Sequence, residues 1–511
     1  MRRHFYLWTI AFVILPTPTP APDADRIRFK ISLSQTLGLK GAAGRMLVFM
    51  SNSAQKPAML AAGFIPGSVW IASAEVGWVA AGQSITLDPD AKAFPKPFSL
   101  APRGTYHFMA LLDRNHSYGY NGTGEGDLYS TVISVKDADP ANAETVDLAL
   151  DHVMKPGFTA KDTPDARLVE FRSPLLSAFW GRPISMRAGV VLPPEGTPPA
   201  GLPAVYHVHG FGGNHHEAWF RGKTLRSQMA SGKLPKMTHV FLDASFSTGH
   251  HVFADSVNNG PWGKALSTEF IPHIERLFRL TPKPYARFLT GHSSGGWSTL
   301  WLQVAYPGFF GGTWSTSPDP VDLREFTGID ATPGSTDNAY RTRGGKPKNL
   351  VRMGGQNLVS IEEFVRQEEV VGDFGGQFAS FEWVWSPKGA GGRPVPLFNR
   401  VTGEQDPEVQ KAWRKYDIRR VLETNWATIG PKLRGKLNVI CGEEDTFHLE
   451  AGVKRLREFF SRVHSDAVCE LIPGRDHMNL YQPYKSYAEG LEVRIAKEMK
   501  ASFDRHRPAG H

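Results

Sequence analysis

The alternation of apolar strands with helices from Arg167 onward constrains the fold of this 511-residue chain more than any other feature of its sequence. The strand candidates are short, nearly continuous apolar runs, and helix candidates such as STEFIPHIERLFR lie between them. After a leading antiparallel pair, LVEFRSPLL and PISMRAGVVLPPE, the runs are AVYHVHG, THVFLDAS, ARFLTGH, GGTWSTSP, KLNVICG and AVCELIPG. Such strands form a mostly parallel sheet that helices cover on both faces. We therefore predict an α/β fold for residues 156–511.

One connection in this pattern is much longer than the others. About 115 residues separate TSPDP from KLNVICG, whereas a few residues usually join a helix to the next strand. Ser360 and Glu363 form a capping box before one helix, and Asp406-Pro407 opens another that runs through EVQKAWRKYDIRRVLETNW. We expect an insertion with its own structure at about residues 320–435. Its aromatic run QFASFEWVWSPKGAGGRPVPLF would either line a substrate pocket or form the core of the insertion.

Residues 26–155 follow a different pattern, in which short runs rich in Val, Ile, Phe and Thr are separated by turn residues. The seven runs are IRFKISLS, RMLVFMS, SVWIASA, QSITLDP, TYHFMALLD, LYSTVISV and TVDLALDHV. This pattern is typical of an all-β sandwich, of an immunoglobulin-like or transthyretin-like kind. Between Asp113 and Asp127, alternating oxygen-bearing side chains leave calcium binding open, although Asp, Asn and Gly are common in any long connection between strands.

The first residues have the features of an export signal. A basic start precedes an apolar run from Phe5 to Leu15, and prolines and the small residue Ala24 follow. We predict a signal peptide at residues 1–24 and a secreted or periplasmic protein. The apolar run is too short to span a bilayer, so we expect no stable membrane insertion after its removal. Because Arg2-Arg3 resembles part of a twin-arginine signal, export by the twin-arginine pathway stays an alternative to the general secretion pathway.

The charge and the cysteine content exclude some classes of protein. The formal net charge is +8, but Lys and Arg are scattered rather than gathered in runs, so we expect no nucleic-acid partner. Two cysteines, Cys441 and Cys469, are too few for a disulfide framework and lie in apolar runs, which predicts buried free thiols. The sequence specifies no oligomeric state.

A glycine-rich turn lies between a predicted strand and a predicted helix. It reads Gly291-His-Ser-Ser-Gly295 and fits the pattern Gly-x-Ser-x-Gly. In this context the glycines let strand and helix approach closely while the central residue adopts a strained conformation that exposes its hydroxyl. We therefore predict that Ser293 is a nucleophile.

A serine needs a base to become a nucleophile, and the base needs an acid that orients it. Two later strands each end in a suitable group, Asp445 in GEED and His477 in PGRDH, in the chain order that this kind of sheet supplies. Glu444 and Asp476 compete with Asp445 for the acid's role. Asp476 is disfavoured because the side chains of adjacent residues in an extended turn point apart, so it is poorly placed to orient His477.

Acyl transfer also needs donors for the negative oxygen that forms in the reaction. The loop His209-Gly-Phe-Gly-Gly213 follows an earlier strand and would supply the N–H of Phe211. The N–H of Ser294, which follows the nucleophile, would supply the second donor. All these groups lie beyond residue 155, so hydrolysis of small esters is expected to survive removal of residues 26–155.

These motifs resemble the esterase family related to esterase D, which includes feruloyl and acetylxylan esterases, enterochelin esterases and mycolyltransferases. The resemblance covers about residues 167–511, in SPLLSAFWGRPISMRAGVVLPPE, VYHVHGFGG, GHSSGG, GEEDTF and PGRDH. It implies an α/β-hydrolase with Ser293, Asp445 and His477 as its catalytic triad, and the Gly442-x-x-Asp445 spacing favours Asp445 over Glu444. The N-terminal sandwich and the insertion lie outside the family pattern, so the family's substrates are not carried over.

The sequence thus predicts a serine esterase that needs no cofactor and no metal, with carbohydrate-linked, feruloyl-type and polymeric esters as candidate substrates. An acyltransferase would use the same triad and stays an alternative. A zinc-dependent hydrolase is a second alternative, because four histidines lie close together: His207, His209, His215 and His216. The binuclear pattern His-x-His-x-Asp-His fails, since Phe211 and Gly212 stand at its last two positions. A surface carbohydrate-binding protein is the third alternative.

Overall fold

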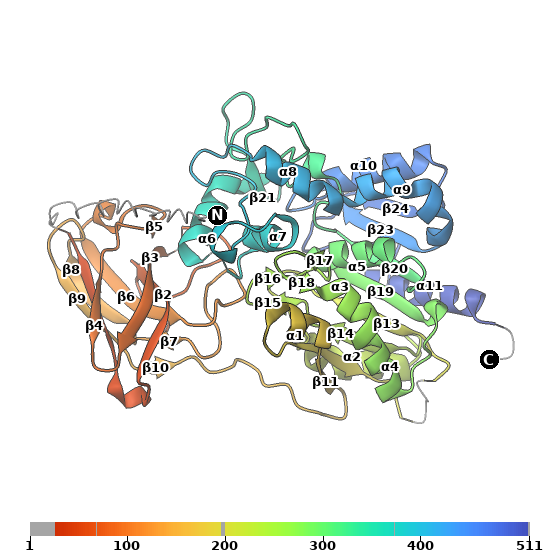
Figure 1. Ribbon diagram of the computed structural model, residues 1–511, viewed down its shortest axis with the longest axis horizontal. Helices are drawn as coiled ribbons and strands as arrows, with labels where there is room; N and C mark the ends of the chain where they lie inside the picture. The colour runs from red at the N-terminus through yellow and green to blue at the C-terminus, as the bar shows by residue number, and fades with distance from the viewer. Residues whose placement is uncertain (1–25, 68, 196–199, 373, 509–511) are drawn as a thin grey trace, which may run out of the picture.

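The computed structural model describes residues 26–67, 69–195, 200–372 and 374–508. The predicted signal peptide, residues 1–24, lies outside them. An all-β part and an α/β part lie side by side, and a helical segment of the α/β part reaches the all-β part (Figure 1). Among the described residues, no helix combines the length and the apolar character that crossing a membrane requires.

Two sheets form the all-β part and share one apolar core. One has the order β4-β1-β9 and the other β10-β7-β6-β2-β3-β5, with β8 paired to β6. Alternate residues of β1, including Phe29, point into this core, where the Phe29 ring lies 5.3 Å from that of Phe108 on β6. Each of the seven predicted runs contains a strand. The strands are β1 (Arg28–Leu33), β2 (Gly41–Ser51), β3 (Trp70–Ala80), β4 (Ser84–Leu87), β5 (Ala93–Phe94), β6 (Gly104–Asp113), β7 (Leu128–Tyr129), β8 (Ile133–Ala138), β9 (Thr145–Leu150) and β10 (His152–Val153).

The α/β part contains a mixed sheet of order β11-β12-β14-β13-β19-β20-β23-β24. Strand β12 pairs antiparallel with β11 and β14, and the remaining neighbours are parallel, as the sequence predicts. Its strands are β11 (Arg167–Arg172), β12 (Ser185–Val191), β13 (Ala204–Val208), β14 (Thr238–Leu242), β19 (Arg287–His292), β20 (Gly312–Thr316), β23 (Leu437–Gly442) and β24 (Val468–Ile472). Short pairs outside it are β15 (Ser245–Phe246) with β16 (Gly249–His250), β17 (Asp255–Ser256) with β18 (Gly260–Pro261), and β21 (Asn349–Met353) with β22 (Gln356–Ser360).

Helices cover both faces of this sheet. Successive residues of β13 point to opposite sides, so Tyr206 and Val208 pack on the side of α4 and Val205 packs on the side of α2 and α11. Because both faces are buried, the strands carry the continuous apolar runs seen in the sequence. The helices are α1 (Pro174–Trp180), α2 (Glu217–Ala230), α3 (Trp262–Ala265), α4 (Ile271–Phe278), α5 (Ser294–Ala305), α6 (Ile361–Val371), α7 (Gln377–Trp385), α8 (Pro407–Trp413), α9 (Ile418–Leu433), α10 (Glu450–Arg462) and α11 (Leu491–His506).

The long connection between β20 and β23 contains its own elements. The hairpin β21–β22 leads into α6 through the predicted capping box, in which the Ser360 N–H donates to Glu363 at 2.9 Å and the Glu363 N–H donates to Ser360 at 3.2 Å. Helix α9 at the end of this connection contacts α5 and α10. It therefore covers the sheet, whereas β21 to α8 form the segment that reaches the all-β part.

The helix predicted to run from Asp406 through EVQKAWRKYDIRRVLETNW is divided in the structure. Helix α8 ends at Trp413, and α9 begins after Asp417. The Asp417 carboxylate accepts from the N–H of Arg420 at 2.9 Å and from the N–H of Leu323 at 3.1 Å. An aspartate that caps a helix start adopts a non-helical backbone, so this tertiary bond to Leu323 favours two helices over one.

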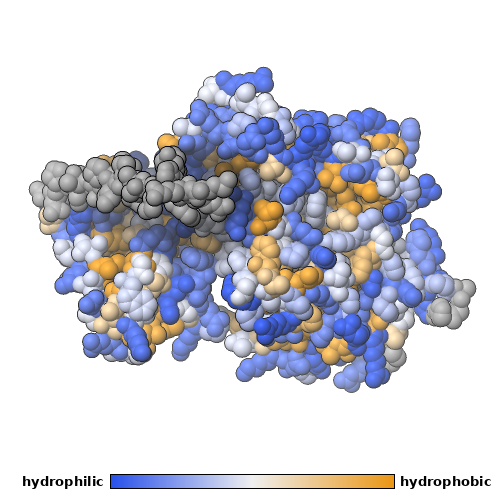
Figure 2. Space-filling model, viewed as in Figure 1, coloured by the Kyte–Doolittle hydropathy of each residue, from blue (hydrophilic) through white to orange (hydrophobic). Residues whose placement is uncertain are grey.

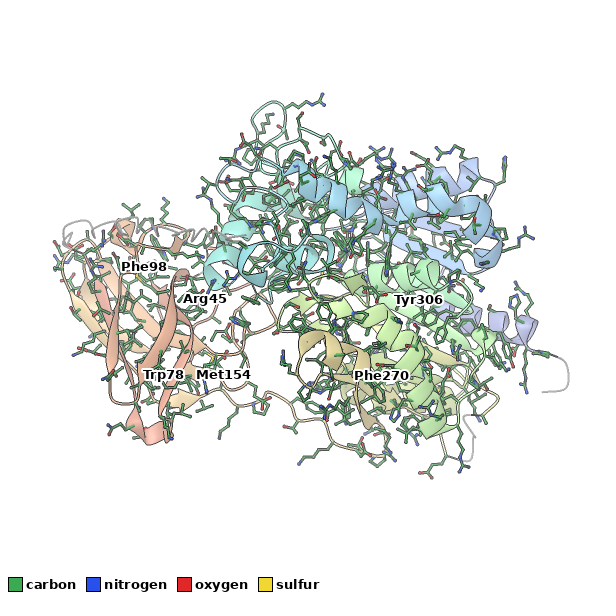
Figure 3. The ribbon with its side chains drawn as sticks, viewed as in Figure 1. Arg45, Trp78, Phe98, Met154, Phe270 and Tyr306 are labelled. Atoms are coloured by element: carbon green, nitrogen blue, oxygen red, sulfur yellow. The ribbon has the colours of Figure 1, made fainter. Side chains whose placement is uncertain are left out.

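Polar contacts join the segment β21–α8 to the all-β part. Arg45 of β2 donates to the Glu369 carbonyl of α6 at 3.2 Å and to the Glu75 carboxylate at 2.7 Å. Figure 3 shows Arg45 at the side of the all-β part that faces this segment. In addition, Gln367 donates to the Gly63 carbonyl at 2.7 Å. These contacts fix helix α6 against the N-terminal sheets.

Both cysteines are free thiols, Cys441 buried and Cys469 half-buried. Burial raises the pKa of the Cys469 thiol to about 12, so it remains protonated at neutral pH. On the face shown in Figure 2, hydrophilic residues predominate and hydrophobic ones lie scattered among them.

We expect the substitution Trp385→Ala to destabilise the protein by about 3–5 kcal/mol, because it leaves a large cavity. The Trp385 ring is buried and packs on Trp297 of α5 and Trp413 of α8, with ring centroids 5.2 and 5.0 Å away. Phe220→Ala is the control, since Phe220 is 68% exposed. The test is the unfolding midpoint in heat and in denaturant, and equal midpoints for the two variants would contradict the expectation.

Candidate active site

The predicted turn has the backbone of a strained elbow. Ser293 lies between the end of β19 and the start of α5 with φ 60° and ψ −125°, a conformation that residues other than glycine rarely adopt. Three hydrogen bonds hold it. The Ser293 N–H donates to Thr316 at 3.0 Å, and the Ser293 carbonyl accepts from Trp297 at 3.0 Å and from Asp319 at 3.2 Å. The backbone of Ser293 therefore has a fixed position at the end of the parallel strands.

The glycines of this turn permit a close approach of three backbones. A Cβ atom at Gly291 would lie 2.4 Å from the Gly295 carbonyl oxygen, and one at Gly295 would lie 2.0 Å from the Val208 carbonyl oxygen. Any side chain at either position would force β13, β19 and α5 apart.

Asp445 and His477 are brought together by the ends of two neighbouring strands. Asp445 follows β23 and His477 follows β24, and His477 Nδ1 lies 2.8 Å from Asp445 Oδ2. The second oxygen of Asp445 accepts from the Phe447 N–H at 2.9 Å. Burial alone would raise the pKa of Asp445, but the His477 ring and these hydrogen bonds outweigh it and hold the pKa below its ordinary value. The carboxylate is ionised at neutral pH and can fix the orientation of the imidazole.

The two competing acids lie in other surroundings. Glu444 is exposed to solvent. Asp476 accepts from the N–H groups of Met478 and Asn479 at 2.9 Å, and so holds its own turn. Asp445, by contrast, is fully buried against the ring of His477.

A further carboxylate lies beside the turn, which the sequence analysis did not identify. Asp319 follows β20, is 3% exposed, and accepts from the hydroxyls of Ser293 at 3.4 Å and of Ser294 at 2.5 Å. Burial raises its pKa to about 6, although both hydroxyls and His477 favour the charged form. In the described part of the chain the Ser293 hydroxyl therefore bonds to Asp319 and not to His477. The sequence signal was the aspartate of TSPDP, directly after a strand of the same sheet.

The predicted oxyanion loop lies next to the turn. A Cβ atom at Gly210 would lie 3.4 Å from Cβ of Ser293, and Phe211 and Ser294 line one small cavity together. Within the described residues the Phe211 N–H donates to no other group.

Aromatic side chains from three regions enclose Ser293. A cavity of about 20 Å³ beside Ser293 and Asp319 has the room of about one water molecule. Its aromatic walls come from the all-β part, from the insertion and from the loop after β23: Phe64, Phe364, Phe378, Phe381 and Phe447. The aromatic run of the insertion thus contributes to this wall through Phe378 and to the buried core through Trp385.

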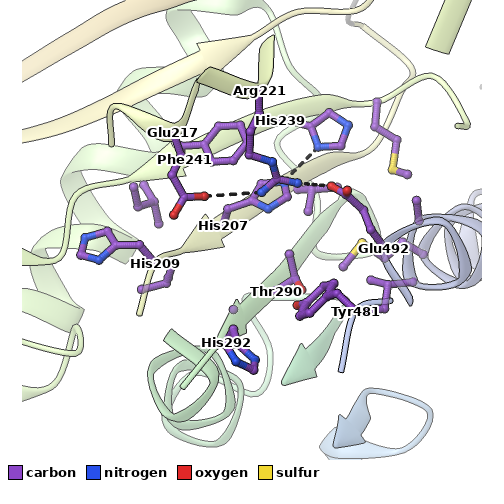
Figure 4. Close-up of a pocket in the computed structure, with 18 of the residues that line it drawn as sticks. His207, His209, Glu217, Arg221, His239, Phe241, Thr290, His292, Tyr481 and Glu492 are labelled. Carbon is purple, nitrogen blue, oxygen red and sulfur yellow. Dashed lines mark hydrogen bonds and ion pairs between the residues drawn. The ribbon is translucent and has the colours of Figure 1, made fainter. Parts of the chain in front are cut away.

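Three of the four histidines of the zinc alternative have polar protein partners. His207 lies 2.9 Å from His239, and His209 accepts from the Ala244 N–H at 2.9 Å. His215 and His209 both lie near the Asp243 carboxylate, at 2.8 and 3.7 Å. Figure 4 shows His207 and His239 in a pocket of about 340 Å³ between the sheet and helices α2 and α11. Among the described residues, no three His, Cys, Asp or Glu side chains are placed to hold one metal ion.

The carboxylates at the two ends of the candidate calcium segment bind hydrogen-bond donors of that segment. Asp113 accepts from the N–H groups of Asn115 and Ser117, at 3.1 and 3.2 Å, and Asp127 accepts from the Gly124 N–H at 2.6 Å and the Ser117 hydroxyl at 2.9 Å. These bonds fix the shape of the connection between β6 and β7.

Part of the chain matches a known protein family. Residues 182–421 match the family model described as Putative esterase, which confirms the resemblance predicted from the motifs. The protein is a carboxylic ester hydrolase. The α/β part has the α/β-hydrolase-like fold of that family, and the match includes the turn at Ser293 and the loop at Phe211, whereas Asp445 and His477 lie beyond it.

Several solved structures are similar to about two thirds of the chain at low identity. A ferulic acid esterase is 13% identical with a TM-score of 0.40, over 66% of this chain and 99% of its own. FphF, a fluorophosphonate-binding serine hydrolase of Staphylococcus aureus, is 15% identical with a TM-score of 0.38, over 65% and 97%. An S-formylglutathione hydrolase from Agrobacterium tumefaciens is 15% identical with a TM-score of 0.37, over 68% and 98%. No curated protein matches the chain.

The pKa of Asp319 makes the stability of the protein depend on pH. The folded-state pKa of about 6 is above the ordinary 3.8. The protonated Asp319 carboxyl therefore contributes fully to the free energy of unfolding below about pH 4, and this contribution is lost as the pH rises through 6. Asp319→Asn cannot ionise, and its stability relative to the native protein should therefore rise by about 3 kcal/mol between pH 4 and pH 7. Denaturant unfolding at several pH values measures this, with the exposed Asp147→Asn as control. A constant difference between Asp319→Asn and the native protein would refute the assignment.

Proposed function

We propose that the protein is a serine esterase in which Ser293, His477 and Asp445 form the catalytic triad. The observation that carries the proposal is the buried contact between His477 Nδ1 and Asp445 Oδ2, beside a serine in a strained elbow. The ionised Asp445 holds the proton on Nδ1, which leaves Nε2 of His477 as the base.

The reaction follows from these positions. Nε2 of His477 takes the proton of the Ser293 hydroxyl as Oγ attacks the ester carbonyl carbon. The N–H groups of Ser294 and Phe211 donate to the oxygen that becomes negative. His477 then gives the proton to the departing alcohol, and the acyl group stays on Ser293. A water molecule then gives a proton to His477 and attacks the acyl carbon. The bond from that carbon to Ser293 Oγ breaks, Oγ takes the proton from His477, and the acid leaves.

Attack requires the Ser293 hydroxyl to turn from Asp319 to His477. The bond to Asp319 is 3.4 Å long and therefore weak, whereas Ser294 anchors Asp319 at 2.5 Å. Catalytic hydrogen bonds are often long before substrate binds and shorten in the complex. Asp319 would thus hold the neighbouring serine while Ser293 is free to move.

The aromatic rings around Ser293 leave room for about one water molecule. Every acyl group larger than that therefore requires these side chains to move apart. Feruloyl-type, carbohydrate-linked and polymeric esters are the candidates. We also propose export through residues 1–24 and an immunoglobulin-like or transthyretin-like class for the N-terminal sheets.

A fluorophosphonate probe should label Ser293, because only a serine with a base beside it reacts at neutral pH. Ser293→Ala should abolish both labelling and the hydrolysis of p-nitrophenyl acetate. Peptide mapping identifies the modified residue. An adduct on Ser294, or labelling that survives Ser293→Ala, would disprove the choice of nucleophile.

Asp445→Asn should lower kcat by about 10³ to 10⁴ while the fold persists, since an amide favours the wrong tautomer of His477. Glu444→Gln is the matched control and should lower kcat less than tenfold, because Glu444 is exposed. Rates at saturating substrate decide between the two acids. A large loss in Glu444→Gln with a normal Asp445→Asn would transfer the role to Glu444.

A further inference from the structure

The connection between β6 and β7 leaves the all-β part and reaches the predicted active site. Its base is fixed by the bonds of Asp113 and Asp127 described above. Its tip is fixed to the insertion, where the Gly119 N–H donates to the Gly375 carbonyl at 3.2 Å and the Tyr120 hydroxyl donates to Gln377 Oε1 at 2.5 Å. The base and the tip of this connection are thus both held, and its two tyrosines, Tyr118 and Tyr120, have defined positions.

Both tyrosines contact the loop that carries Phe211. The Gly212 N–H donates to the Tyr118 hydroxyl at 2.7 Å. The Phe211 ring packs on both tyrosines, with centroids 5.0 Å from Tyr118 and 4.7 Å from Tyr120, edge to face in both cases. Burial raises the pKa of Tyr118 well above its ordinary value, so its hydroxyl is a neutral acceptor for this N–H at any physiological pH.

The hydrogen bond to Tyr118 fixes the peptide plane that follows Phe211. Gly212 has φ +84°, a left-handed conformation that favours glycine. Because Tyr118 holds the Gly212 N–H and the Phe211 ring packs on both tyrosines, the backbone of Phe211 has little freedom to rotate. Its own N–H then points in a constant direction, which an oxyanion donor requires.

A second contact from the all-β part reaches the loop that carries Asp445. Phe64, between β2 and β3, packs on Phe447 with a centroid distance of 5.8 Å. Phe447 in turn packs edge to face on His477, 4.8 Å away, and its N–H donates to Asp445. The N-terminal sheets therefore touch both the oxyanion loop and the neighbourhood of the acid and base.

We propose that Tyr118 is a positioning residue of the esterase, which orients the Phe211 N–H through the bond from Gly212, so that the all-β part completes the active site. The proposal rests on the proposed function of Ser293 and Phe211. It reverses the expectation from the sequence that small esters are hydrolysed without residues 26–155. A protein without this part would keep its triad and lose the support of its oxyanion loop.

Tyr118→Phe in the full chain tests this proposal, because it removes the acceptor and keeps the ring. We expect kcat for p-nitrophenyl acetate to fall about tenfold, while KM changes less than twofold. This is a smaller effect than the fall in kcat of about 10² to 10³ that follows removal of an oxyanion donor itself. The unfolding midpoint should stay within about 2 °C, since Tyr118 is half-buried and its ring contacts persist. The rate of Ser293 labelling by a fluorophosphonate should fall in parallel with kcat, because the phosphonyl oxygen occupies the same donors.

Tyr106→Phe is the matched control. Its hydroxyl donates to the Pro102 carbonyl at 2.6 Å within the all-β part, and its loss should leave kcat unchanged. If Tyr118→Phe is as active as Tyr106→Phe while Ser293→Ala is inactive, the positioning role is wrong and the proposed function stands. If Tyr118→Phe lowers the unfolding midpoint and raises KM along with the loss of kcat, its role is structural and the proposal fails. An active Ser293→Ala would overturn the proposed function itself.

Discussion

The close crossing of strand β19 and helix α5 on strand β13 is the constraint on which the candidate site depends. Glycine at positions 291 and 295 lets backbone atoms of these elements meet, and the chain between them must then turn so sharply that Ser293 adopts φ 60°. The strain is offset by the hydrogen bond that the Ser293 N–H donates to Thr316 and by those that the Ser293 carbonyl accepts from Trp297 and Asp319. Since parallel strands end at one edge of a sheet, the loops after β13, β20, β23 and β24 all converge on this turn.

Two buried carboxylates near Ser293 differ in pKa because their partners differ. Asp445 receives hydrogen bonds from His477 and from a backbone N–H, and its pKa is lowered despite complete burial. Asp319 faces neutral hydroxyls, which compensate burial only in part, and its pKa rises to about 6. One carboxylate is thereby suited to orient an imidazole, and the other to hold a serine hydroxyl. Burial is similar in both cases, so the nature of the partner decides the direction in which the pKa shifts.

The enclosure of Ser293 is built from parts of the chain that are far apart in sequence. Phe64 comes from the all-β part, Phe378 from the insertion, and Phe447 from the loop after β23. Such a wall can change its shape only if contacts between these parts change, including those of Arg45 and Gln367 with their backbone partners. Access to Ser293 is therefore coupled to the packing of the insertion against the N-terminal sheets.

The sequence by itself determined the sheet, its helices and the order of the chemical groups along the chain. The period of apolar residues predicted the strands, and the Gly-x-Ser-x-Gly turn predicted the elbow at Ser293. The loops of Asp445 and His477 could be predicted to meet because consecutive parallel strands end at the same edge. These signals are local, or depend only on the direction of a strand. Both kinds can therefore be recognised in the sequence without the structure.

Only the tertiary structure decided which side chains complete the site. Asp319 follows a strand like any turn residue, and its role depends on hydroxyls brought to it by α5. The long helix predicted from Asp406 is divided at Asp417 by a bond to Leu323, 94 residues away in the chain. Tyr118 lies in a segment whose composition suggested a calcium loop, yet its hydroxyl meets Gly212 across the same sequence separation. Contacts of this kind depend on how separate parts of the chain pack, which no local pattern of residues encodes.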